Sequence, residues 1–280
     1  AGGASRRAAL GLMLGAGYAA AAAPVVAQQA IHTGTDGLVA GEVSYSVHGF
    51  DVPAYRAAPQ GRTGLPVVLV VSEIFGVHEY IADVCRRLAH AGYLAIAPDL
   101  FERQGDPMAY SEIAKLMSEL VAKVPDAQVM ADLEGAVHWA GANGGDVAKV
   151  AITGFCWGGR IAWLYAAHGP VRAGVAWYGR LLGQASALTP QHPVDMAPCL
   201  KAPVLGLYGE KDGGIPLDTV AKMKAALSSS GTAAAKASEL VIFPEAPHAF
   251  HADYRPSFRK DAAEDGWRRM LAWFRQHGVA

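Results

Sequence analysis

Short apolar runs alternate with helical patterns along most of the chain. From Glu42 onward, each apolar run is followed by a stretch in which apolar residues recur at spacings of three and four. This alternation is typical of a mostly parallel sheet whose strands are connected by helices, and it differs from the pattern of a β-sandwich or a helix bundle. The sequence therefore predicts one α/β domain with a doubly wound sheet and helices on both faces.

The pattern predicts about eight strands. The first two, 43–47 and 52–57, alternate apolar and polar residues and are joined by His48-Gly49, which indicates an antiparallel pair. The later strands are predominantly apolar, as buried parallel strands are: 66–71, 93–97, 147–153, 171–177, 203–208 and 240–243. The expected helices are 80–91, 108–120, 126–142, 157–167, 217–230 and 257–277. Segment 179–200 has no clear period and contains three prolines, so we expect a loop there.

The first residues have the form of a targeting segment. Arg6-Arg7 precedes an uncharged stretch rich in Ala and Gly, with small residues up to Ala27, which resembles a twin-arginine signal. We expect a signal segment at 1–27, a connector at 28–41 and the folded domain at 42–280, with an exported or periplasmic protein if the signal is used and a cytoplasmic one if it is not. A membrane anchor or an Ala-rich tail are the alternatives. The stretch has few Leu, Ile and Phe residues, so no stable membrane span is expected after processing.

Composition narrows the possible partners. Hydrophobic residues make up 52% of the chain and charged residues 18%, which excludes disorder for most of it. The net charge is −1, and no basic run outside the N-terminus is long enough to follow a phosphate backbone, so nucleic acid is not an expected partner. Cys85, Cys156 and Cys199 are too few for a disulfide scaffold or a zinc site made of CxxC pairs. Whether Cys85 and Cys199 pair, and which oligomer forms, stay open.

The sequence Gly154-Phe155-Cys156-Trp157-Gly158 lies between an expected buried strand and an expected helix. A nucleophile flanked by glycines at such a junction is the nucleophile elbow of α/β hydrolases, in which a sharp turn exposes the central side chain above the sheet. The following helix N-terminus favours a thiolate and a developing oxyanion. The alternative is a buried cysteine in a tight glycine turn, because free cysteines often pack as small apolar residues.

Two further residues follow in the chain order that this kind of site requires, which is nucleophile, acid, histidine. Asp212 follows the strand 203–208 and is placed to orient an imidazole, with Glu210 as the rival acid. His248 follows the last expected strand and is the natural general base. Each residue alone reads as a surface loop residue, but together with Cys156 they predict a catalytic triad.

Glu73 comes directly after the first central strand, in the loop that supplies an oxyanion donor in such hydrolases. We expect the backbone N–H groups of Ile74 and Trp157 to be the two donors. A carboxylate at Glu73 would disfavour a neighbouring thiolate, and the alternative is a strand-end acid that faces water. His248 and His251 could be read as a metal pair, but no third ligand has matching spacing, so we expect no metal and place His251 behind the site or in solvent.

Four segments together resemble the dienelactone hydrolase family. They are Ser72-Glu73-Ile74-Phe75-Gly76, Ala97-Pro98-Asp99-Leu100-Phe101, the segment around Cys156, and Pro247-His248-Ala249-Phe250. The resemblance implies an α/β-hydrolase fold and a hydrolase that opens a dienelactone to maleylacetate without a metal or an organic cofactor. It also implies that Cys156 is the nucleophile, His248 the base, Asp212 its orienting acid, and Glu73 the group that takes the thiol proton when substrate arrives.

The resemblance implies less about the substrate. Arg103 and Tyr178 match substrate-binding positions of the family, but Ala252 stands where its second arginine is found, and Arg255 is close enough in sequence to replace it. The expected partner is a small ester or lactone. Two other functions remain open: a redox-sensing or ligand-binding thiol on the same fold, and an acyltransferase that uses the same triad.

Overall fold

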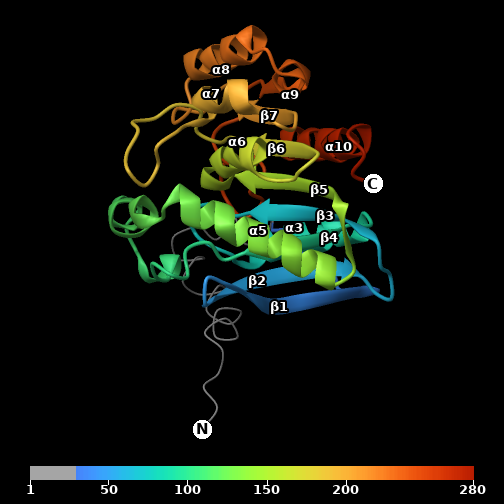
Figure 1. The fold of residues 1–280 in the computed structure, drawn as a ribbon. Coiled ribbons are helices and arrows are strands. Elements are labelled where there is room, and N and C mark those ends of the chain that lie inside the picture. The colour runs from blue at the N-terminus through green and yellow to red at the C-terminus, as the bar shows by residue number, and fades with distance from the viewer. Residues whose placement is uncertain (1–29) are drawn as a thin grey trace.

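The computed structural model describes residues 30–280, which form one eight-stranded sheet in the order β1-β2-β4-β3-β5-β6-β7-β8 (Figure 1). The strands are β1 (Leu38–Val47), β2 (Phe50–Pro59), β3 (Leu65–Val71), β4 (Leu94–Pro98), β5 (Gly145–Phe155), β6 (Ala173–Trp177), β7 (Val204–Gly209) and β8 (Glu239–Phe243). β2 pairs antiparallel with both β1 and β4, and all later pairs are parallel. This confirms the predicted fold class.

Helices cover both faces of the sheet (Figure 1). The longer ones are α3 (Glu79–His90), α5 (Asp126–Ala142), α6 (Trp157–His168), α8 (Leu217–Ser229) and α10 (Lys260–Gln276). Arg87 of α3 and Trp267 of α10 line one cavity, so these two helices share a face. Arg160 of α6 makes two hydrogen bonds of 2.7 Å to Asp126 of α5, which joins that pair of helices. β4, β6 and β7 are buried along their whole length because both of their faces are covered.

The first strand begins earlier than the sequence pattern predicted. β1 starts at Leu38, inside the expected connector 28–41, and pairs with β2 as far as Leu38↔Pro59. Ala40 and Gly41 interrupt the alternation of apolar and polar residues, which is why the pattern placed the start of this strand at Val43. The expected signal segment 1–27 lies outside the described residues.

The predicted helix 108–120 is wrong. The structure has four short pieces there, η1 (Pro107–Ala109), α4 (Ile113–Lys115), η2 (Leu116–Leu120) and η3 (Val121–Lys123). The side chains of Ile113 and Met117 are exposed, so the spacing of apolar residues does not produce a continuous buried face. The expected loop 179–200 contains two short helices, α7 (Pro193–Met196) and η4 (Ala197–Cys199), and α9 (Ala233–Ala237) had no predicted counterpart.

Within residues 30–280, no helix is both long and apolar enough to cross a membrane. Cys85 is buried in α3, whereas Cys199 is exposed in η4, and both are free thiols. The two cysteines therefore do not form the disulfide that the sequence left open.

Candidate active site

Cys156 occupies the turn between β5 and α6. Its backbone has φ 56° and ψ −114°, a conformation that residues with a side chain rarely adopt. The Cys156 N–H donates to the Trp177 carbonyl at 3.0 Å, which fixes the turn to the end of β6. The strained turn leaves Cys156 only partly buried, as a nucleophile that must meet substrate requires.

The glycines on both sides of Cys156 are required by close contacts between backbones. A Cβ atom at Gly154 would lie 2.0 Å from the Gly158 carbonyl oxygen, and one at Gly158 would lie 2.3 Å from the Val71 carbonyl oxygen. Only glycine permits such an approach. The start of α6 therefore lies directly against the end of β3, where the loop that contains Glu73 begins.

The expected oxyanion donors come from these two neighbouring segments. Trp157 is the first residue of α6, so its N–H has no acceptor within the helix. Ile74 lies in the turn after β3. In residues 30–280, neither N–H donates to another backbone carbonyl outside the regular elements. Both groups are therefore available to a negatively charged oxygen.

The structure places Asp212, and not Glu210, against His248. Asp212 is 4% exposed, and its Oδ2 atom lies 2.7 Å from Nδ1 of His248. Its Oδ1 atom accepts hydrogen bonds from the N–H groups of Gly214 and Ile215, at 2.9 and 3.1 Å. Backbone groups of the turn that contains Asp212 therefore orient its carboxylate, and the carboxylate orients the imidazole of His248. Glu210 accepts a hydrogen bond from the Glu245 N–H instead.

The pKa of His248 is raised by Cys156 as well as by Asp212. Burial alone would lower the pKa of His248, but hydrogen bonds to Asp212 and Cys156, together with the negative charge of both partners, raise it to about 10. An imidazolium is therefore favoured between a carboxylate and the cysteine sulfur.

Glu73 does not face water, because its side chain is completely buried. Its Oε2 atom accepts a hydrogen bond of 2.6 Å from the Tyr254 hydroxyl, and its Oε1 atom lies 3.6 Å from a guanidinium nitrogen of Arg255. Oε1 has no hydrogen-bond partner of good geometry among the described residues. A buried carboxylate oxygen in this condition can accept a proton or a polar group of substrate.

Arg255 and Tyr178 both lie at this site. The guanidinium of Arg255 is over the ring of Phe75, 5.8 Å from its centre. Burial lowers the pKa of Arg255. Electrostatic interactions with four neighbouring groups outweigh burial and raise this pKa, in the order Glu73, Tyr254, Tyr178 and Cys156. The buried ring of Tyr178 is 5.2 Å from that of His248. Ala252, at the position where the family has its second arginine, is completely buried. In the loop after His248, Arg255 is the arginine that lies near Glu73.

Arg103 does not join them. Its guanidinium forms an ion pair with the buried carboxylate of Asp132 on α5, donates to the Val47 carbonyl at 3.4 Å and lies over the ring of Phe50, 4.3 Å from its centre. These contacts hold it against the β1–β2 hairpin. The expectation that Arg103 binds a substrate carboxylate is therefore not supported by its position, because its charge is already balanced.

Sequence reasoning missed two tyrosines behind the site. Tyr254 holds Glu73, and the Tyr80 hydroxyl lies 2.6 Å from Nδ1 of His251. No motif marks either tyrosine, because the contacts join residues far apart in the sequence. His251 is 2% exposed, which corrects the expectation that it could be solvated. No group of three or more metal-binding side chains occurs within the part of the chain that the structure describes.

Comparisons with known proteins place this chain in a family. The model of the dienelactone hydrolase family matches residues 52–278. A protein of Methylorubrum extorquens with the provisional name carboxymethylenebutenolidase is 56% identical over 278 residues, 99% of this chain and 94% of its own. An Escherichia coli K12 protein with the same provisional name is 56% identical over 264 residues, 94% of this chain and 96% of its own.

The crystal structure of a Klebsiella pneumoniae protein, provisionally named a dienelactone hydrolase, has a TM-score of 0.83 and 57% identity, and the match covers 85% of this chain and 99% of that one. The family match spans nearly the whole described domain, including the elbow, the acid turn and the histidine loop. The chain therefore belongs to the dienelactone hydrolase family, whose members are hydrolases that act on ester and lactone bonds.

Proposed function

We propose that the protein hydrolyses a lactone or carboxylic ester through an acyl-enzyme on Cys156. The observation that carries the proposal is the strained turn that presents Cys156, together with a His248 that is oriented by Asp212 at 2.7 Å and has a pKa raised by both residues. Nucleophile, base and orienting acid in this order are the parts that acyl transfer requires. The provisional names of the relatives, carboxymethylenebutenolidase and dienelactone hydrolase, support the same reaction class.

The proposed reaction has two steps. The Cys156 sulfur attacks the carbonyl carbon, and the N–H groups of Ile74 and Trp157 bind the oxyanion. When the intermediate collapses, the carbon–oxygen bond of the ester breaks and His248 gives its proton to the leaving oxygen. His248 then takes a proton from water, whose oxygen attacks the thioester, and the cysteine leaves. For a lactone, the alcohol and acid products are one molecule.

Glu73 and Arg255 add a substrate-dependent element to this proposal. Arg255 lies 3.6 Å from Glu73 and has 30% of its side chain exposed, so a substrate carboxylate can reach it. Such a carboxylate would compete with Glu73 for the guanidinium and leave Glu73 free to accept the thiol proton. We therefore infer that the substrate is an ester or lactone that also carries a carboxylate, held by Arg255 rather than by Arg103.

The decisive experiment compares hydrolysis of a dienelactone with that of an aryl acetate, which has no carboxylate. Cys156→Ala should abolish turnover of both, while Arg255→Ala should slow the dienelactone much more than the acetate. Arg103→Ala serves as the matched control, because Arg103 is bound to Asp132. If Cys156→Ala keeps its esterase activity, the mechanism is wrong; if Arg255→Ala affects both substrates equally, the carboxylate assignment is wrong.

We also propose that the protein is exported. The proposal rests on Arg6-Arg7 and the uncharged stretch that follows. Fractionation of cells should find the protein in the periplasm, and replacing Arg6-Arg7 by Lys-Lys should retain it in the cytoplasm. An equal distribution of the two forms would contradict the proposal.

A further inference from the structure

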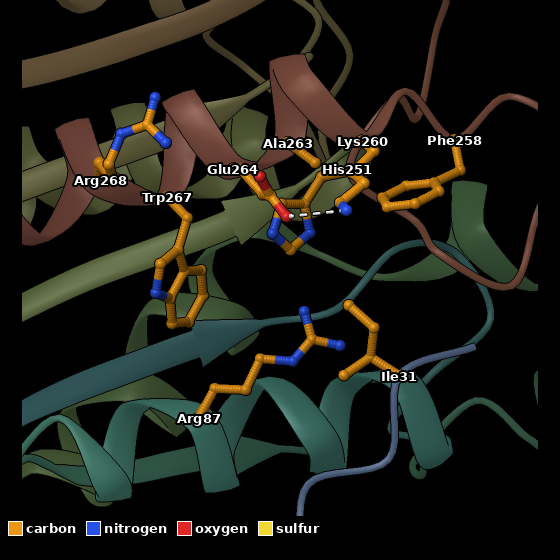
Figure 2. A pocket seen from close by; sticks show the side chains of 9 residues that line it. All are labelled: Ile31, Arg87, His251, Phe258, Lys260, Ala263, Glu264, Trp267 and Arg268. Carbon is orange, nitrogen blue, oxygen red and sulfur yellow. Dashed lines mark ion pairs between the residues drawn. The ribbon is translucent and has the colours of Figure 1, made fainter. Parts of the chain in front are cut away.

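A cavity of about 700 Å³ lies between α3 and α10 (Figure 2). Its volume is in the range of pockets that bind small molecules. The nine side chains that line it are those of Ile31, Arg87, His251, Phe258, Lys260, Ala263, Glu264, Trp267 and Arg268. None of them belongs to the triad or to the pair of Glu73 and Arg255, so the proposed ester hydrolysis leaves this cavity without a role.

Two aromatic side chains, those of Trp267 and Phe258, line the cavity. The Trp267 indole extends from α10 into it, and the Phe258 ring lies at the opposite end (Figure 2). The indole is stacked on His251, with 5.8 Å between ring centres and an angle of 22° between the rings. Walls of this kind favour a planar ring, which can stack on the indole.

His251 contributes a hydrogen-bond donor that has no use within the protein. Burial, and secondly the charge of Arg87, lower the pKa of His251 well below its usual value, so the imidazole is neutral. Nδ1 lies 2.6 Å from the Tyr80 hydroxyl, and when Tyr80 donates there, the ring proton is on Nε2. Nε2 has no partner among the hydrogen bonds of residues 30–280, although the side chain is 2% exposed and projects into the cavity (Figure 2).

Arg87 contributes a second donor and limits the charge of the ligand. Its Nε and Nη2 atoms donate to Asp83 and Asp253, both at 2.5 Å, and Nη1 has no acceptor within the described residues. A third carboxylate at this guanidinium would be repelled by the two already present. The two other cations that line the cavity each have a carboxylate partner, because Lys260 pairs with Glu264 at 3.9 Å and Arg268 pairs with Asp265 at 3.1 Å.

From these contacts we infer that the cavity binds a small, neutral, planar aromatic molecule that carries a carbonyl group. The ring stacks on Trp267, and the carbonyl oxygen accepts hydrogen bonds from Nε2 of His251 and Nη1 of Arg87. A carbonyl satisfies two donors without adding charge to the Arg87 cluster. The inference is independent of the proposed hydrolysis, because no triad residue takes part.

Calorimetry with the full chain and three matched probes tests this. The probes are 1-indanone, indane, which lacks the carbonyl, and indane-1-carboxylate, which replaces it by an anion. We expect saturable binding of 1-indanone that is at least about five-fold tighter than that of either other probe, the factor that one buried hydrogen bond contributes. No saturation up to about 10 mM, or equal binding of 1-indanone and indane, would overturn the inference.

Variants locate the binding. Trp267→Ala removes the stacking surface and should weaken 1-indanone binding about ten-fold. His251→Phe keeps a ring but removes the Nε2 donor, and should weaken it about five-fold. Trp139→Ala is the matched control, because Trp139 is also partly buried on a helix but does not line the cavity, and it should leave binding unchanged. Binding that survives Trp267→Ala at full strength would place the ligand elsewhere and overturn the inference.

Discussion

The Asp212 carboxylate is held by backbone groups of its own turn and also accepts a hydrogen bond from His248. Its two oxygens have separate tasks, because Oδ1 accepts two backbone N–H groups and Oδ2 faces His248. In Asp212→Asn the side chain cannot accept with both atoms, so the imidazole loses its fixed orientation. We expect kcat/KM for ester hydrolysis to fall on the order of 10³-fold. Glu210→Gln is the control, and an equally small effect of both changes would contradict the assignment.

The raised pKa of His248 depends on Cys156 as well as on Asp212. Burial lowers this pKa, and hydrogen bonds and charge from the two partners raise it from 6.5 to about 10. Cys156→Ala should therefore bring the pKa below the wild-type value, as measured by NMR titration of the ring protons. Because the folded pKa is raised, the stabilisation by His248 is complete below pH 6.5 and is lost as the pH rises through about 10. An unchanged pKa in Cys156→Ala would show that the sulfur does not contact the ring.

At the scale of elements, the junction of β3, β5 and α6 decides whether the site can form. A Cβ atom at Gly158 would lie 2.3 Å from the Val71 carbonyl and 2.6 Å from the Ser72 carbonyl, and neither backbone can move without shifting β3. Gly158→Ala should lower the free energy of unfolding by about 1–3 kcal/mol or more, the usual cost of overpacking, as measured by urea denaturation. Gly213→Ala meets nothing within 4 Å and should be close to neutral. Equal stability of the two variants would refute the packing argument.

The sequence predicted correctly those elements whose hydrophobic pattern is compatible with only one kind of secondary structure. β4, β6 and β7 are apolar throughout because both faces are covered. Cys156, Asp212 and His248 could be proposed because each comes after a strand, β5, β7 and β8, in the chain order of a nucleophile, an acid and a histidine. The spacing in 108–120 was misleading because a surface segment can have the same spacing without a buried face. Tyr254 and the true partner of Arg103 could not be predicted, since both depend on contacts between distant parts of the chain.

At the scale of the whole molecule, one network of ion pairs and hydrogen bonds joins three segments that are distant in sequence. Arg87 of α3 bonds to Asp253, which lies in the loop between His248 and α10. The same helix binds the segment before β1, because Asp83 accepts the Thr33 N–H at 2.5 Å and Arg86 donates to the Thr33 carbonyl at 2.8 Å. The segment around Thr33 and the loop between His248 and α10 are therefore both bonded to α3.

Asp83 is the centre of this connection and provides its test. Its carboxylate is 1% exposed and accepts hydrogen bonds from Thr33, Arg86 and Arg87. Asp83→Asn leaves two arginines without their shared buried counter-charge, so we expect the free energy of unfolding to fall by about 3–5 kcal/mol. Limited proteolysis near Thr33 should accelerate as well, since the segment loses its anchor. Asp218→Asn removes only an exposed pair with Lys222 and should do neither. The connection is refuted if Asp83→Asn is as stable as Asp218→Asn and cleavage near Thr33 is unchanged. The segment around Thr33 would then be held by other contacts, and α3 would not connect it to the loop that contains His248.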